Sequence, residues 1–238
     1  MAARTAKKTT TSTAAKKTET AYQSPVEKYW ALRLQTAKEA FEDNHYLVSI
    51  VQTLDEARRL VLDSIIPGLN PGSISFGGSH TVSASGLTAD LIAQKDIPVI
   101  NTVEYTIPPE ELYERRRQAL LVDLLFCSVN GATMDGKLVL LDGIGNRSAA
   151  VQFGPKNVVL FISRNKLVEN LSDAMERTRT MAAPMNGLRL QRKTPCAKVG
   201  ECMDCNSPER LCNAWTIMEK CPKKHRIHIV LINTDAGY

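Results

Sequence analysis

The stretch KNVVLFIS, residues 156–163, decides the fold class of this 238-residue chain. It is a short and nearly continuous run of apolar side chains, rich in β-branched residues, that follows a Gly-Pro pair. Such a run is typical of a strand that is covered on both faces, because a strand with one wet face alternates apolar and polar residues. DLLFCSV (123–129) and RIHIVLINT (226–234) have the same character. The three stretches together predict a buried, mainly parallel sheet.

Helical patterns alternate with these strands. Apolar side chains recur at helical spacing in five segments: residues 24–44, 54–66, 81–95, 108–122 and 165–183. Ser24 and Pro25 predict the beginning of the first helix, and Asn165 is the candidate cap of the last. Strands that alternate with helices favour a single three-layer α/β/α domain.

Shorter strands complete the predicted sheet. GSISFGG (72–78) and IPVINTV (97–103) are two of them. KLVLLD (137–142) and SAAVQF (148–153) have the length and composition of two more, on either side of a glycine turn. A hairpin is expected before this turn, with MDGK (134–137) as its tight turn.

Residues 1–24 differ in composition from the rest of the chain. The formal net charge is +5, and residues 1–20 alone contribute +4, from five basic side chains and one acidic one. This Thr, Ala and Lys segment lacks the apolar residues that a core needs, so it is expected to be a disordered basic tail before a folded domain at 25–238. Because the remainder is nearly neutral, nucleic acid is not an expected partner of the folded part.

The chain has no apolar run of the length that a membrane span requires, and its beginning lacks the apolar segment of a secretory signal. A cytoplasmic location is therefore expected. In that reducing compartment structural disulfides rarely persist. The six cysteines are then expected to bind metal, to take part in redox chemistry, or to be inert thiols.

The first candidate site is the turn that follows the strand at 72–78. A glycine turn at the beginning of a helix lets backbone N–H groups approach an anion. It is equally explained as a tight turn that needs positive φ, and both interpretations stay open. The candidate ligand-binding residues are Gly77, Gly78, Ser79, His80 and Thr81.

The second candidate site is a polar and glycine-rich segment between apolar strands. An arginine among glycines suits two-pronged binding of a carboxylate or phosphate, although Arg147 can equally pair with Asp142. GIGNRS (143–148) resembles the dinucleotide fingerprint only weakly, because Gly154 and Pro155 leave no room for the crossover helix that the fingerprint requires. The candidates here are Asn130, Thr133, Asp135, Gly136, Asp142, Gly143, Asn146 and Arg147.

Two lysines flank the strand at 156–163 and are a third source of charge for an anionic ligand. Lys156 is included among the ligand-binding candidates. Lys166 is interpreted by default as a solvated lysine at a strand end.

The fourth candidate is the stretch at 194–212, which holds four cysteines with the spacing C-x5-C-x2-C-x6-C. The C-x2-C pair is a common ligand pair for zinc and iron–sulfur clusters. The spacing does not fit a zinc ribbon, and no histidine lies inside the segment, so an all-thiolate site is expected, with a [4Fe–4S] cluster favoured over zinc. Cys127 is interpreted as an inert core thiol. The predicted metal ligands are Cys196, Cys202, Cys205 and Cys212.

Three blocks in order, FGGSHTVSASGL (76–87), residues 129–168 and TPCAKVGECMDCNSPERLCN (194–213), resemble the lactate-utilisation (LUD) domain family. The chain is similar to its single-domain members with a C-terminal four-cysteine segment. The resemblance implies a fold of the NagB/RpiA/CoA-transferase-like type, with the Cys-rich loop at 194–221 inside the domain. It also implies a link to lactate oxidation by an iron–sulfur-containing system of several subunits.

The leading functional hypothesis is a redox-associated protein that serves oxidation of lactate or a related 2-hydroxy acid. It would bind a small organic acid or phosphate-bearing ligand, carry the thiolate metal site, and act with iron–sulfur partner subunits. The alternatives are a non-catalytic ligand-binding or regulatory module with structural zinc, and an isomerase or transferase of the wider fold group. Whether the chain itself catalyses a reaction stays open.

Overall fold

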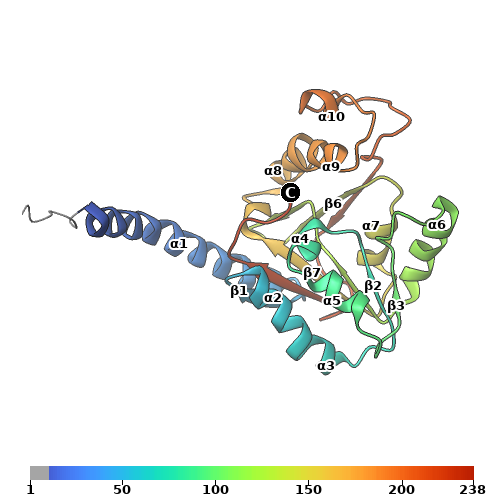
Figure 1. Cartoon of the computed structure of the whole chain (residues 1–238), viewed down its shortest axis with the longest axis horizontal. Coiled ribbons are helices and arrows are strands. Elements are labelled where there is room, and N and C mark those ends of the chain that lie inside the picture. The colour runs from blue at the N-terminus through green and yellow to red at the C-terminus, as the bar shows by residue number, and fades with distance from the viewer. Residues whose placement is uncertain (1–10) are drawn as a thin grey trace, which may run out of the picture.

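The computed structural model describes residues 11–238, and the side chains from residue 25 onward. Its centre is a six-stranded sheet in the order β1-β10-β7-β4-β2-β3 (Figure 1), in which every neighbouring pair is parallel. The strands are β1 (Leu47–Val51), β2 (Ile74–Phe76), β3 (Val99–Ile100), β4 (Leu124–Cys127), β7 (Asn157–Ser163) and β10 (Ile227–Ile232). β4 and β7, two of the stretches with continuous apolar side chains, lie in the middle of the sheet, where both faces are covered. The predicted three-layer α/β/α class with a mainly parallel sheet is confirmed.

One face of the sheet is covered by helices from the first half of the chain. They bury a cluster that includes Val61, Leu87, Phe126 and Phe161. Each helix contributes a few apolar side chains on one side, which is the pattern that the periodicity predicted. The elements of this layer are α2 (Leu54–Leu60), the π-helical turn η1 (Val61–Ile65), α3 (Ile66–Leu69), α4 (His80–Ala84) and α5 (Leu87–Ala93).

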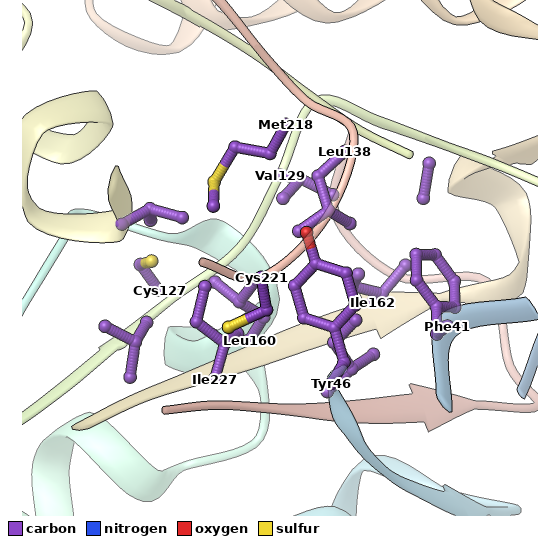
Figure 2. Packing of buried hydrophobic residues seen from close by; sticks show 14 of the residues in the cluster. Phe41, Tyr46, Cys127, Val129, Leu138, Leu160, Ile162, Met218, Cys221 and Ile227 are labelled. Carbon is purple, nitrogen blue, oxygen red and sulfur yellow. The ribbon is translucent and has the colours of Figure 1, made fainter. Parts of the chain in front are cut away.

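The opposite face is covered by helices and by a second, smaller sheet. This sheet has the order β8-β5-β6-β9, and its strands are β5 (Gly131–Thr133), β6 (Leu138–Asp142), β8 (Leu167–Val168) and β9 (Ala214–Met218). Figure 2 shows the core on this side, where the Tyr46 ring lies beside Phe41 and the sulfur atoms of Cys127 and Cys221 belong to the same cluster. The other elements are α1 (Thr11–Asp43), α6 (Pro109–Gln118), η2 (Ala119–Leu121), α7 (Asn146–Gln152), η3 (Arg164–Lys166), α8 (Leu171–Arg177), η4 (Thr178–Ala182), α9 (Ala183–Arg189) and α10 (Cys196–Val199).

The predicted hairpin is confirmed. β5 and β6 are antiparallel and are joined by the turn at 134–137. Gly136 has φ of +83°, and a Cβ there would lie 2.7 Å from the Ala40 carbonyl oxygen of α1. Asn44 donates from its amide to the carbonyls of Asp135 and Gly136, so the end of α1 holds this turn in place.

Two expectations about secondary structure are wrong. SAAVQF (148–153) is not a strand, because residues 146–152 form α7, which begins after Gly145 in the left-handed region at φ of +77°. The long helix expected from Asn165 begins only at Leu171, where Asn170 accepts a hydrogen bond from the Asp173 amide as the N-cap. Before it, β8 pairs with β5, and this long-range pairing overrides the local helical preference.

α1 extends further toward the N-terminus than the helix expected from residue 24. It begins at Thr11, so residues 11–24, which were expected to belong to the disordered tail, form its first turns. Alanine and lysine, which are frequent in this segment, are good helix formers. Residues 1–10 of the expected tail lie outside the described residues.

A buried arginine determines where α7 ends. Arg226 is 8% exposed. It donates to the carbonyl oxygens of Ala150 at 2.8 Å, Val151 at 2.6 Å and Pro155 at 3.0 Å. These carbonyls at the end of a helix have no partner within the helix itself, so Arg226 supplies the hydrogen bonds that they would otherwise lack.

We expect Arg226→Met to lower the free energy of unfolding by about 3 kcal/mol, because it leaves several buried carbonyls without a donor. Urea denaturation measures the change. Arg59→Met, which removes an exposed arginine of α2, is the matched control and should change stability by less than about 0.5 kcal/mol. Equal effects of the two substitutions would contradict the structural role of Arg226.

Candidate functional site

The carboxyl ends of the parallel strands meet at one edge of the central sheet, and a cavity of about 200 Å³ opens there. Gly77 follows β2, Ser128 follows β4, Lys166 lies just beyond β7, and Tyr238 lies at the end of the segment that follows β10. Ligands of open α/β sheets bind at this edge, because the loops that follow neighbouring strands converge there. The cavity is therefore the candidate functional site.

One wall of the cavity is a hydrogen-bonded network around Asp142, at the end of β6. One carboxylate oxygen accepts from Arg147 Nε at 2.9 Å and Nη2 at 2.6 Å. The other accepts from the Ser148 amide and hydroxyl, each at 2.6 Å. Arg147 Nη2 also donates to the Asn130 side-chain oxygen at 2.6 Å. Within the described residues Arg147 Nη1 makes no hydrogen bond, so it is the donor of this guanidinium that a ligand can use.

Gly77 is required by this wall. A Cβ at this position would lie 2.5 Å from Cys127 Cβ and 3.2 Å from Arg147 Cγ. Real Cβ atoms do not approach this closely, so any other residue would push the arginine or the strand away. The glycine turn found in the sequence therefore makes room for the Arg147 side chain.

The floor of the cavity holds a buried lysine. Lys166 is 2% exposed, and its Nζ donates to Thr81 Oγ1 at 2.9 Å, Ser128 Oγ at 2.8 Å and the Val129 carbonyl at 3.3 Å. No carboxylate among the described residues lies within ion-pair distance of it. Burial, together with the charges of Arg177 and Arg147, lowers the pKa of Lys166 to about 7.

Three more arginines line the cavity toward solvent: Arg116 from α6, Arg189 from α9, and Arg192 after it. Asn186 orients Arg189, because its side-chain oxygen accepts from Nε at 3.2 Å and from Nη2 at 2.8 Å. Asp142 is the one carboxylate side chain that lines the cavity in the described part of the chain, and Arg147 already pairs with it. The cavity thus has an excess of positive charge, which favours an anionic ligand.

The segment after β10 closes one side of the cavity. The Ala236 carbonyl accepts from the Thr81 hydroxyl at 3.4 Å and from the Ser163 hydroxyl. The Tyr238 ring stacks on His80 with 5.5 Å between ring centroids. Burial raises the pKa of Tyr238. These contacts position His80 at the rim, with one face of its ring covered.

The structure brings most of the predicted ligand-binding residues together. Thr81 lies beneath the cavity, where it holds Lys166. Those that line the cavity are Gly77, Gly78, Ser79, His80, Asn130, Asp142, Gly143, Asn146 and Arg147.

Four predicted residues lie elsewhere. Thr133, Asp135 and Gly136 form the closed end of the β5–β6 hairpin, against α1, whereas the cavity lies at its open end. Lys156 precedes β7 and pairs with Asp123 at 2.6 Å, so it lies at the amino edge of the sheet. Parallel strands separate their two ends by their own length, and this is why Lys156 and Lys166 cannot meet.

Sequence reasoning named Arg147 but missed three of the arginines that give the cavity its charge, and it misjudged the burial of Lys166. The default interpretation of Lys166 as solvated is wrong, and its position just beyond the carboxyl end of a buried strand was the signal that could have corrected it. Arg116, Arg189 and Arg192 carried no comparable signal. They reach the cavity only because α6 and α9 pack beside it.

The Cys-rich loop adjoins the cavity. Leu211 lines the cavity, and Asn213 donates from its amide to the Gly143 carbonyl at 3.0 Å. Arg210 links the backbones of two cysteines, because its guanidinium donates hydrogen bonds to the carbonyls of Cys205 and Cys212. The loop is thus tied to the site through its own polar contacts.

The four cysteines of this loop are the predicted metal ligands. Between residues 25 and 238 no group of three or more His, Cys, Asp or Glu side chains is arranged to hold a metal ion. Cys196, Cys202, Cys205 and Cys212 are half-buried free thiols. Cys221 is fully buried in the core beside Tyr46, and burial raises the pKa of Cys127 to about 12, as expected of an inert core thiol.

Comparison with known proteins gives one family. The sequence model of the LUD domain matches residues 34–232. A crystal structure of a DUF162 family protein from Deinococcus radiodurans is similar to the chain with a TM-score of 0.48 and 12% sequence identity, over 85% of this chain and 97% of that one. No curated protein matches. Among the helices of the described residues, none combines the length and the apolar character needed to cross a bilayer.

The buried lysine predicts a specific dependence of stability on pH. The pKa of Lys166 is about 7 in the folded chain and near 10.5 in the unfolded chain, so between these values the unfolded state binds more protons. We expect the free energy of unfolding to rise with pH across this window, by up to about 5 kcal/mol relative to Lys166→Met. Urea denaturation at several pH values measures the difference, and parallel curves for the two proteins would contradict it.

Proposed function

The chain belongs to the LUD domain family, and from that premise we propose that its cavity binds a small organic anion. The single observation that supports this is the charge of the cavity. Lys166 and four arginines line it, and its one carboxylate side chain in the described chain, Asp142, is already paired with Arg147. An anion that enters would supply the missing negative charge and would exchange its hydration for fixed donors.

We infer further that the ligand is a 2-hydroxy acid of the lactate type or the corresponding 2-oxo acid. The cavity of about 200 Å³ suits a ligand of a few carbon atoms. Its floor offers Lys166, held by the hydroxyl groups of Ser128 and Thr81, and its amine can bind a hydroxyl or carbonyl oxygen next to a carboxylate. In this proposal the chain is one component of a system that oxidises such acids together with iron–sulfur partner subunits.

The role of each group follows from its position. Arg147 Nη1 and Arg189 bind the carboxylate, because guanidinium groups match its two oxygens. Lys166 contacts the oxygen at C2. Asp142 and Asn130 hold Arg147 in place and do not bind the ligand themselves. Tyr238 and His80 cover one side and limit the access of water.

We expect Arg189→Gln to weaken the binding of lactate or pyruvate by about tenfold or more, since it removes a charge-assisted hydrogen bond. Isothermal titration calorimetry with lactate, pyruvate, inorganic phosphate and a sugar phosphate measures affinity. Lys156→Gln is the matched control, because Lys156 lies at the other edge of the sheet. Equal affinities for all three proteins would contradict the proposed site, and a clear preference for the sugar phosphate would favour an isomerase or transferase.

The thiolate metal site stays a prediction. Iron–sulfur or zinc binding would require the loop to draw its four sulfur atoms together, and all four belong to one partly exposed segment. We expect protein purified without oxygen to contain iron and sulfide, with visible absorption that Cys205→Ser and Cys212→Ser abolish. Cys221→Ala is the control, because that thiol is buried in the core.

Metal analysis of the same samples separates the alternatives. Stoichiometric zinc without iron would favour a structural zinc site in a binding module. A protein free of both metals would remove the metal prediction and leave the anion-binding proposal unaffected.

A further inference from the structure

We propose that the side-chain amine of Lys166 forms a reversible covalent imine with the oxo group of a 2-oxo acid bound in the cavity. This inference rests on the proposed anion-binding function and names the ligand class more closely. A 2-hydroxy acid would bind to the same groups without a covalent bond. The cavity would therefore distinguish the oxidised from the reduced form of one acid.

The hydrogen bonds around Nζ allow a neutral amine. The Ser128 hydroxyl donates to the Phe161 carbonyl at 2.6 Å, and the Thr81 hydroxyl donates to the Ala236 carbonyl at 3.4 Å. Both hydroxyl oxygens therefore act as acceptors toward Lys166. A neutral amine has two N–H bonds, and these two acceptors satisfy both of them. The third contact of Nζ, with the Val129 carbonyl at 3.3 Å, is the longest of the three, and in the neutral amine the lone pair takes the place of that N–H bond and is used by neither hydroxyl.

The charges around Lys166 keep the amine neutral for much of the time. The groups that act on it are Arg177 from α8, Arg147 from α7 and the Cys127 thiol from β4. Two of these three are cations, and no carboxylate among the described residues lies within ion-pair distance. With a pKa of about 7, Lys166 has roughly a thousandfold more neutral amine at pH 7 than a solvated lysine. A lysine beside another cation in a buried site is a known arrangement for imine formation.

Arg147, one of these two cations, also positions the ligand in the cavity. A carboxylate held by Arg147 Nη1 leaves C2, the next carbon atom, inside the cavity that Lys166 lines. Because the carboxylate charge is met by guanidinium groups, the lysine need not remain protonated to neutralise it. The arginines thus bind the carboxylate of the ligand, and the lysine amine reacts with its carbonyl carbon.

The step is balanced without an external oxidant. The amine nitrogen attacks C2, a C–N bond forms, and the carbonyl π pair moves to oxygen, which takes a proton that the nitrogen loses. The resulting carbinolamine loses its hydroxyl group with a second nitrogen proton as water, which leaves a C=N bond. Hydrolysis reverses both steps. The hydroxyls of Ser128 and Thr81 adjoin the nitrogen and can pass these protons.

Reductive trapping of the full chain tests the proposal. The protein is incubated with pyruvate, reduced with borohydride, which delivers hydride to the imine carbon, and mapped by peptide mass spectrometry. We expect modification at Lys166 at least about tenfold faster than at Lys156, whose side chain is 76% exposed. The rate at Lys166 should level off above about pH 7, whereas the rate at Lys156 should continue to rise. Excess lactate, which has no carbonyl, should slow only the reaction at Lys166.

Three results would overturn the proposal. One is pyruvate binding by calorimetry without a trapped adduct at Lys166, and this would leave the anion-binding function standing. Another is trapping at Lys166 and Lys156 at similar rates. The third is the absence of binding by pyruvate and lactate alike, which would remove the proposed function as well. Lys166→Arg removes the nucleophilic amine and should give no adduct at residue 166, while the wild-type mapping stands even if this variant does not fold.

Discussion

The buried carboxylate of Asp142 is the constraint on which the site depends. It accepts two hydrogen bonds from Arg147 and two from Ser148, so it joins the end of β6 to the first turn of α7. A buried charge is tolerated only when it is paired and fully hydrogen-bonded. Here the Arg147 guanidinium pairs with the carboxylate, and Ser148 in the first turn of α7 supplies the other hydrogen bonds. The end of the small sheet is thereby fixed to α7, and the cavity lies beside this contact.

This pairing also decides the chemistry of the cavity. Because Asp142 is committed to Arg147, no carboxylate side chain remains for Lys166, Arg189 or Arg192 among the described residues that line the cavity. A positive site at the carboxyl edge of a parallel sheet suits a small anion. The buried lysine adds a second property, because burial and the nearby arginine charges lower its pKa to about 7.

Part of this could be predicted from residue patterns. The continuous apolar runs of β4, β7 and β10 predicted a buried parallel sheet, because a strand without polar side chains on either face must be covered on both. The glycine turn at Gly77 and the segment around Arg147 were predicted as two candidate sites, and in the structure both line one cavity. The prediction was wrong for α7, where the short apolar segment at 148–153 fits a strand or a helix equally well. In the structure it is a helix, with Asp142 bound to its first turn and Arg226 to its last carbonyls.

By itself the sequence determined the α/β/α class, the hairpin at 134–137 and the glycine turn, because strand burial, turn type and positive φ are local demands on residue type. Only the tertiary structure decided which charges face the cavity. Lys156 and Lys166 both lie next to an end of β7 in the sequence. The direction of β7 places Lys156 in solvent and Lys166 at the buried floor of the cavity. Arg189 and Arg192 reach the cavity because α9 packs beside it. Such long-range packing leaves no pattern in the neighbouring sequence.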